Sequence, residues 1–288
     1  MDAWHSFIAS PPHFELVLFL ISVLAGVVGS ILGLGGGVII VPALTLLFGI
    51  NIHYAIGASI VSVIATSSGA AATYVKDHIT NIRVAMLLEV ATSVGALSGA
   101  MLSSMINARA LFLIFSLILL YSAFAMTRKR KSEAAVEGDA WASRLQLNSS
   151  YPDAVLGQEV FYQVTGVPLA FSLMIGAGVL SGLLGNGSGA LKVPAMDRAM
   201  RLPIKVSSAT SNFMIGVTAA ASAGAYYMKG DILPFLAAPV AIGVLVGAWM
   251  GTRIMMRLSS RHIRNAFLVV LLIIAFQMGL KGIGIEVR

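Results

Sequence analysis

The chain has 288 residues, of which 58% are hydrophobic and 11% are charged, and it contains no cysteine. Its mean hydropathy is +0.90, so the composition excludes an ordinary soluble domain and indicates an integral membrane protein. The lack of cysteine excludes disulfides, thiolate metal sites and cysteine nucleophiles, and in a membrane protein the net charge of +7 indicates basic cytoplasmic loops and not nucleic-acid binding.

Apolar runs of membrane-spanning length recur along the chain. The first, Phe14–Gly33, has 20 residues with one charge at its edge, Glu15, and would be about 30 Å long as a helix. No basic region precedes it, so we expect a retained helix and not a signal peptide. The sequence predicts an all-α integral membrane protein with eight full transmembrane helices, at about 14–33, 54–75, 82–105, 111–126, 164–184, 206–228, 232–256 and 263–279.

A glycine-rich passage interrupts the apolar pattern twice. Residues 25–43 and 177–195 lie 152 positions apart and are identical at 10 of 19 positions. The same offset aligns Ser59 with Ser211, Thr66 with Thr218 and Tyr74 with Tyr226. The chain is therefore divided into a first transmembrane repeat, 1–126, a polar cytoplasmic linker, 127–163, that we expect to be mobile, and a second repeat, 164–288.

Each repeat also has a short segment with a Val-Pro pair, 38–50 and 190–202, which decides the topology. If these segments do not cross the membrane, the repeats are parallel and the 19 Lys and Arg divide 10 against 9; if they cross, the repeats are inverted and the division is 14 against 5. Because Lys and Arg concentrate on the cytoplasmic side, inverted repeats are favoured, with eight to ten crossings and both termini outside. The larger group is Lys76, Arg83, Arg128, Lys129, Arg130, Lys131, Arg144, Arg198, Arg201, Lys205, Arg253, Arg257, Arg261 and Arg264.

The glycine passages favour an anion site. Alternate glycines permit positive φ angles, and a helix that begins after the break offers unpaired N–H groups to an anion. Gly-xxx-Gly spacing is also typical of helix packing, and for the glycines at 95–99 and 243–251 packing is the favoured interpretation. At 33–37 and 185–189 a site is favoured, because Asn186 and Ser188 exceed what a packing seam needs.

Two of the few ionisable residues within predicted spans or breaks are functional candidates. Lys192 replaces Ile40 of the first repeat and is either an anion ligand or a lysine that reaches the membrane surface. Glu89 carries a coupled proton or pairs with Arg83. The five histidines show no metal-ligand spacing. The candidate substrate-binding residues are Gly33, Gly35, Gly36, Gly37, Gly185, Asn186, Gly187, Ser188, Gly189, Lys192, Ser59, Thr66, Ser211, Asn212 and Thr218.

At these residues the sequence resembles the TauE/SafE family of sulfite exporters. The resemblance rests on Gly-x-Gly-Gly-Gly-x-x-x-Val-Pro at 33–42, its counterpart Gly-Asn-Gly-Ser-Gly-x-x-x-Val-Pro at 185–194, the Ser/Thr-rich helices that follow and the basic linker. It implies transport of sulfite, sulfonates or thiosulfate across the cytoplasmic membrane of a bacterium or archaeon, commonly outward.

The sequence therefore predicts a secondary transporter of small sulfur-containing anions that exports them by alternating access. An anion channel and an importer of another small organic anion are the alternatives. No G-x-x-x-x-G-K-[ST] motif occurs, so direct use of ATP is not expected, and the spans carry no His, Asp and Glu constellation typical of an enzyme. The expected partners are the lipid bilayer and the anion, without nucleic acid or cofactor; a coupled proton or ion and a homodimer are left open.

Overall fold

A computed structural model describes residues 11–127, 139–185 and 187–284, and most of these residues are helical. The first repeat contains α2 (Pro11–Leu32), α3 (Gly37–Pro42), the π-helix η1 (Ala43–Leu47), α4 (Ile52–Lys76), α5 (Ile82–Leu102), the short 3-10 helix η2 (Ser103–Met105) and α6 (Ala108–Thr127). The linker contains α7 (Ala140–Arg144), β1 (Ser149–Asp153) and β2 (Gln158–Tyr162). The second repeat contains α8 (Val167–Leu184), α9 (Gly189–Arg198), α10 (Ile204–Met228), α11 (Pro234–Arg257) and α12 (Ser260–Gly282).

The eight predicted spans all coincide with long helices, but in the described part of the chain only seven of them are apolar enough to qualify as membrane spans. The exception is α10, which has 25 residues, as many as α4. Its polar residues are covered by neighbouring helices, so this helix need not be apolar toward lipid: Lys205, Ser207, Ser208, Thr210, Ser211, Asn212, Thr218 and Ser222 are all buried. The expected count of eight full spans is therefore not confirmed: seven helices in the described part are candidate spans by length and composition.

Two pairs of helices enter the bundle and return to the same end. In the second repeat the amide of Thr165, just before α8, donates to the carbonyl of Met200, just after α9. In the first repeat the ring of Phe14 in α2 lies 5.1 Å from that of Phe48, the residue that follows η1. At about 1.5 Å per residue, neither Gly37–Leu47 nor α9 is long enough to cross a hydrocarbon core of about 30 Å. The short segments are therefore re-entrant, the alternative to crossing that the sequence left open, but the expectation that segments which do not cross give parallel repeats is wrong for α4 and α10, which run antiparallel.

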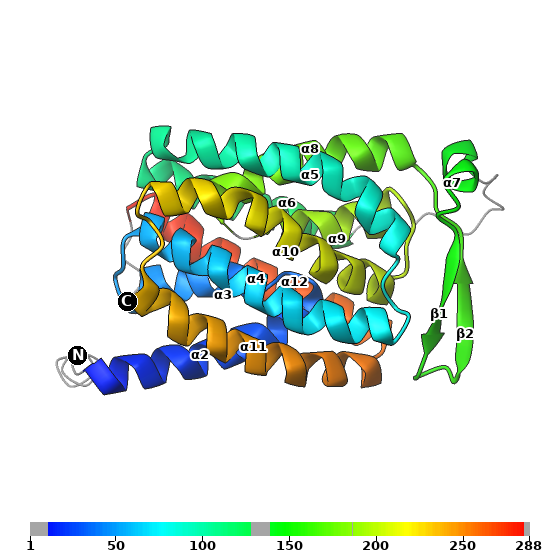
Figure 1. Ribbon diagram of the computed structural model, residues 1–288, viewed down its shortest axis with the longest axis horizontal. Helices are drawn as coiled ribbons and strands as arrows, with labels where there is room; N and C mark the ends of the chain where they lie inside the picture. Colours follow the sequence, from blue (N-terminus) through cyan, green and yellow to red (C-terminus); the bar gives the residue numbers. More distant parts are fainter. Residues whose placement is uncertain (1–10, 128–138, 186, 285–288) are drawn as a thin grey trace.

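Helices α4 and α10, which correspond to each other at the offset of 152, run in opposite directions. Figure 1 shows α2 beginning and α12 finishing at one end of the bundle, here called the terminal end, whereas the β1–β2 hairpin lies at the other, the hairpin end. The end of α10 meets the start of α4, where a Cβ on Gly57 would lie 2.1 Å from the carbonyl oxygen of Asp231. Near the hairpin end, Thr210 of α10 accepts a hydrogen bond from the amide of Asn81, which precedes α5. Helices α4 and α10 therefore lie side by side and antiparallel.

Each repeat packs its first helix against the other repeat. Glycines make the close approach possible: a Cβ on Gly99 of α5 would lie 2.0 Å from the Val179 carbonyl oxygen of α8. In the equivalent contact, a Cβ on Gly247 of α11 would lie 2.1 Å from the Val23 carbonyl oxygen of α2. The predicted packing role of the glycines at 95–99 and 243–251 is confirmed, because each of these surfaces is filled by backbone.

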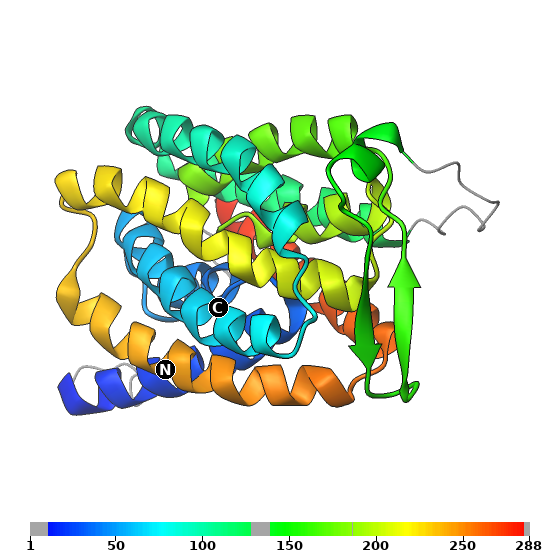
Figure 2. The same ribbon diagram turned by 45° about the vertical axis from the view of Figure 1, so that its right-hand side comes forward.

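The linker differs from the mobile segment that we expected. Figures 1 and 2 show the β1–β2 hairpin running crosswise to the helices, over the end of the bundle. It is fixed from three directions: the buried Lys205 Nζ lies 2.9 Å from Asp153 Oδ1, Asn81 Nδ2 donates to the Leu147 carbonyl at 2.8 Å, and Arg83 donates to the Gln146 carbonyl. These anchors belong to α10 (Lys205), to the α4–α5 connection (Asn81) and to α5 (Arg83). Residues 128–138 of the linker lie outside the described part.

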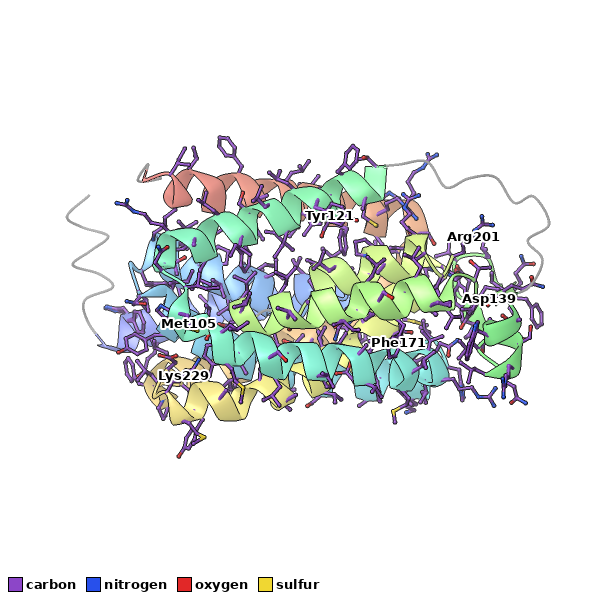
Figure 3. All side chains as sticks on the ribbon, turned by 90° about the horizontal axis from the view of Figure 1, so that it is seen from above. Met105, Tyr121, Asp139, Phe171, Arg201 and Lys229 are labelled. Carbon is purple, nitrogen blue, oxygen red and sulfur yellow. The ribbon has the colours of Figure 1, made fainter. Side chains whose placement is uncertain are left out.

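Basic residues of the larger predicted group gather at the hairpin end. Figure 3 shows Asp139 and Arg201 at this end and Met105 and Lys229 at the opposite one. Arg198 donates to the carbonyl of Met126 at 2.7 Å, and Arg264 pairs with Asp197 at 2.9 Å. Arg128 to Lys131 lie outside the described residues.

Candidate functional site

The predicted breaks are present at corresponding places in both repeats. Helix α2 ends at Leu32 and α3 begins at Gly37; α8 ends at Leu184 and α9 begins at Gly189. Between the helices the backbone takes positive φ angles, which favour glycine, at Gly33 (71°), Gly35 (65°), Gly185 (62°) and Gly187 (68°), and also at Ser188 (56°). Asn186 lies outside the described residues. The alternate glycines are thus required by backbone conformation.

The two breaks meet inside the bundle. A Cβ on Gly189 would lie 2.3 Å from the Gly33 carbonyl oxygen. Gly35 and Gly187 both face Val63 and Ile215, and these two residues are themselves 152 positions apart. A Cβ on Gly36 would lie 2.7 Å from Ser62 Oγ and 3.3 Å from Thr66 Oγ1. The glycine clusters, including the buried Gly37, therefore form one site built from both repeats.

The start of each re-entrant helix has the same backbone pattern. In α3 the amides of Ile39 and Ile40 donate to the Gly36 carbonyl, and in α9 those of Leu191 and Lys192 donate to the Ser188 carbonyl. The amides before these first helical bonds have no partner within their own helix. Their partial positive charge is directed toward the place where the breaks meet.

Most of the predicted hydroxyl candidates bind backbone carbonyls. Ser211 Oγ donates to the Gly33 carbonyl at 2.6 Å, and its counterpart Ser59 Oγ donates to the Gly185 carbonyl at 2.8 Å. Each repeat therefore fixes the break of the other. Thr66 donates to the Ser62 carbonyl, and Asn212 Nδ2 donates to the carbonyls of Ser30 and Ser208.

Two buried polar atoms near these groups have no hydrogen-bond partner among the described residues, namely Ser62 Oγ and Asn212 Oδ1. Ser62, which the sequence-based set does not include, approaches the Gly36 backbone that Thr66 also faces. A hydrogen-bonding group buried without a partner costs about 1–3 kcal/mol, so both atoms suit a polar ligand or a bound water.

Lys192 and Glu89 form a buried ion pair that the sequence did not predict. Lys192 Nζ lies 3.5 Å from Glu89 Oε2, with 0% of the lysine side chain and 8% of the glutamate side chain exposed. Thr218 bridges them: its hydroxyl accepts from Lys192 and donates to Glu89 Oε1 at 2.6 Å. Ser93 also donates to Oε1, at 2.9 Å. Helix α9 therefore supplies the positive group and α5 the negative one, and the Thr218 hydroxyl of α10 bridges the two.

This pair excludes one of the two alternatives for each ionisable residue, and the other stays a prediction. A lysine that reached the membrane surface would be exposed at its ammonium, whereas Lys192 is fully buried. Glu89 does not pair with Arg83, which instead donates to the Gln146 carbonyl in the linker. Of the sequence signals, the replacement of Ile40 by Lys192 and the lone acid at Glu89 were visible, but nothing in the pattern joins α5 to α9.

Comparisons with known proteins agree with this architecture. A family model described as "Sulfite exporter TauE/SafE" matches residues 18–278. The probable membrane transporter protein YunE of Bacillus subtilis is 27% identical over 93% of this chain and 98% of its own length. YdhB of the same organism is 27% identical over 83% of this chain and 87% of its own. The probable membrane transporter protein MJ0441 of Methanocaldococcus jannaschii is 24% identical, over 86% of this chain and 89% of its own.

No solved structure matches this chain. The relatives are named as probable membrane transporters, and the matches cover most of their length. Both facts agree with a transporter and not with an enzyme.

Proposed function

This chain belongs to the TauE/SafE family, and from that premise we propose that it exports small sulfur-containing anions, sulfite or an organosulfonate, by alternating access. The single observation that carries the proposal is the meeting of the two backbone breaks beside a fully buried lysine. Paired breaks near the midplane are typical of substrate sites in secondary transporters.

An anion suits this place for two reasons. The amides at the starts of α3 and α9 that have no partner within their own helix supply partial positive charge, and Lys192 supplies a full one. The Ser62 hydroxyl, which has no partner among the described residues, can donate to an oxyanion oxygen, and those of Thr66 and Thr218 can do so if they leave their present acceptors. In the proposal the glycines and Ser188 provide close backbone approach, whereas Ser59, Ser211 and Asn212 hold the two breaks in register.

The two halves act as inverted repeats that rock about this site. The antiparallel course of α4 and α10 and the re-entrant pairs that enter from opposite ends support this arrangement. The gathering of Lys and Arg at the hairpin end supports a cytoplasmic position for that end, in the cytoplasmic membrane of a bacterium or archaeon.

Substrate class is tested first by binding. The detergent-purified protein is heated with sulfite, thiosulfate, taurine, sulfoacetate and carboxylate controls, and we expect the sulfur-containing anions to raise the unfolding temperature. A response restricted to cations or neutral solutes would contradict the anion proposal. Lys192→Ala is expected to remove the response, with Lys229→Ala, which follows α10 at the terminal end of the bundle, as the control.

Carrier and channel are separated by counterflow in proteoliposomes. A carrier takes up labelled anion faster when unlabelled anion is present on the other side, and its flux saturates. Flux that neither saturates nor depends on trans substrate would favour the anion channel.

A further inference from the structure

The ion pair between Lys192 and Glu89 has the chemistry of a coupling site. With both groups ionised, the pair is neutral overall, and the Thr218 hydroxyl contacts both groups. Glu89 Oε2 is buried and has no hydrogen-bond partner among the described residues, although it lies 3.5 Å from the Lys192 ammonium. It is therefore the atom of the pair best placed to accept a proton.

An anion that binds Lys192 must change the charge of this site. If Glu89 stayed ionised, one ammonium would face two negative groups, and an uncompensated charge buried away from water costs several kcal/mol. If a proton binds Glu89 Oε2 at the same time, the new O–H removes the competing charge and the loaded site is neutral again. The same charge balance then holds in the empty and the loaded states.

We propose that Glu89, Thr218 and Lys192 form a proton–anion coupling site at which one monovalent anion and one proton bind and are released together. This inference rests on the anion transport proposed above and adds its coupling ion. Transport by this site is electroneutral for a monovalent anion, so the membrane potential does not drive it. Export then follows the outward anion gradient and carries protons in the same direction.

Thr218 connects the two states through its single hydrogen. Its hydroxyl lies 2.6 Å from Glu89 Oε1 and 3.0 Å from the carbonyl oxygen of Met214, so it has two acceptors within reach. A hydroxyl donates one hydrogen and accepts with two lone pairs. When Glu89 is ionised the hydrogen goes to Oε1 of the carboxylate; when Oε2 carries the proton, Oε1 is a weaker acceptor and the hydrogen can turn to the Met214 carbonyl.

No other titratable group in the described part competes for this role. Helix α8, which packs on α5, carries none, and the repeat counterparts of Lys192 and Glu89 are the uncharged Ile40 and Ala241. The titratable groups on the packed elements are engaged elsewhere or lie at the surface: Lys205 pairs with Asp153, Tyr226 donates to Gly182 and Leu183, Asp197 pairs with Arg264, Arg83 donates to Gln146, and Tyr121 and Tyr227 are exposed. One proton for each anion is therefore expected.

The wild-type protein in proteoliposomes tests the coupling directly. Isethionate and, in mildly acidic buffer, bisulfite are supplied in separate arms, with a pH dye inside and valinomycin with potassium to set the voltage. The expected result is one proton moved with each anion and a flux that does not respond to voltage. Anion flux that responds to voltage without moving protons would overturn the coupling and leave the proposed function standing. Absence of protein-dependent flux for both anions would overturn the proposed function as well.

Glu89→Gln separates exchange from net transport. The amide imitates the protonated acid, so the loaded carrier can still cycle, whereas the empty carrier holds an unpaired buried ammonium. We expect counterflow to persist while net flux and its pH signal fall by at least about tenfold. Asp153→Asn, which removes the acid of another buried lysine pair outside the spans, should lower neither. Net proton-coupled flux in Glu89→Gln at the wild-type rate would contradict the inference, and if the variant does not reconstitute, the wild-type arms decide.

Discussion

The buried ion pair makes Lys192 and Glu89 energetically dependent on each other. Breaking a buried pair by removing one partner costs about 3–5 kcal/mol, whereas replacing both partners with uncharged groups is often nearly neutral. We therefore expect Lys192→Met to lower the thermal unfolding temperature of the detergent-solubilised protein, and Lys192→Met with Glu89→Gln to recover most of the loss. Equal destabilisation in the single and double variants would show that the two charges are not coupled.

The double variant also separates stability from transport. It should regain thermal stability without regaining anion flux, because the ammonium is still missing. The measurement is uptake per molecule of reconstituted protein, compared with the single variant at equal abundance. Recovery of flux together with stability would place Lys192 among structural residues.

Individual residues were predictable to different extents. Gly33 and Gly185 could be identified from the repeat alone, because positive φ is a local requirement that glycine meets. Lys192 was visible because its repeat counterpart is Ile40. Its partner Glu89 was not, since that contact depends on where α9 returns within the bundle. Substrate binding by the fifteen candidate residues stays a prediction.

At the scale of helices, the small-residue seam between α5 and α8 offers a matched test within one helix. A Cβ on Gly178 would lie 2.2 Å from the Thr92 carbonyl oxygen, whereas a Cβ on Gly176 would meet nothing within 4 Å. We expect Gly178→Ala to lower the unfolding temperature and reduce membrane abundance. Gly176→Ala should have no such effect or should stabilise the protein slightly, since alanine favours helix over glycine by about 1 kcal/mol. The reverse order would contradict the packing described here.

The hairpin contact with α10 should depend on pH. Burial alone would raise the pKa of the Asp153 carboxyl, but the Lys205 ammonium and the Val155 amide hold that pKa below its ordinary value. The contact is therefore fully stabilising above the ordinary pKa of an aspartate and is lost as the pH falls through the lowered one.

Limited proteolysis of the hairpin checks this pH dependence. Cleavage by an acid-active protease should rise as the pH is lowered through the acidic range, while the transmembrane helices stay protected. Asp153→Asn should be cleaved readily at every pH, because it lacks the ion pair throughout. A wild-type cleavage rate that is independent of pH would show that another contact holds the hairpin.

The linker shows where element prediction failed. Its polar, charged composition is typical of a mobile segment, and the two five-residue strands carry only a weak alternating pattern. What orders them lies elsewhere in the chain, in Asn81 and Lys205. By contrast, the long helices follow from local hydrophobicity, apart from α10, whose polar residues are covered by its neighbours.

At the scale of the whole molecule, reporter enzymes fused to the chain can test its orientation in the membrane. If the halves are inverted repeats in the cytoplasmic membrane, the terminal end faces outward and the hairpin end faces the cytoplasm. A periplasm-active enzyme fused after residue 288 should be active, and a cytoplasm-active reporter there should be silent. The same reporters inserted at residues 128–138 should give the opposite pattern. Equal signals at the two places would contradict the inverted arrangement.

The exchange of first helices between the halves has a consequence for biosynthesis. Helix α2 leaves the ribosome long before α11, against which its glycine seam packs, because everything from Leu32 to Pro234 must be made in between. Until then the backbone that α11 will cover is exposed to lipid or to an insertion factor, and the open break at Gly33 has no Ser211 to hold it. Neither half is a complete folding unit, so the nascent protein becomes committed to its final structure only when its last helices enter the membrane.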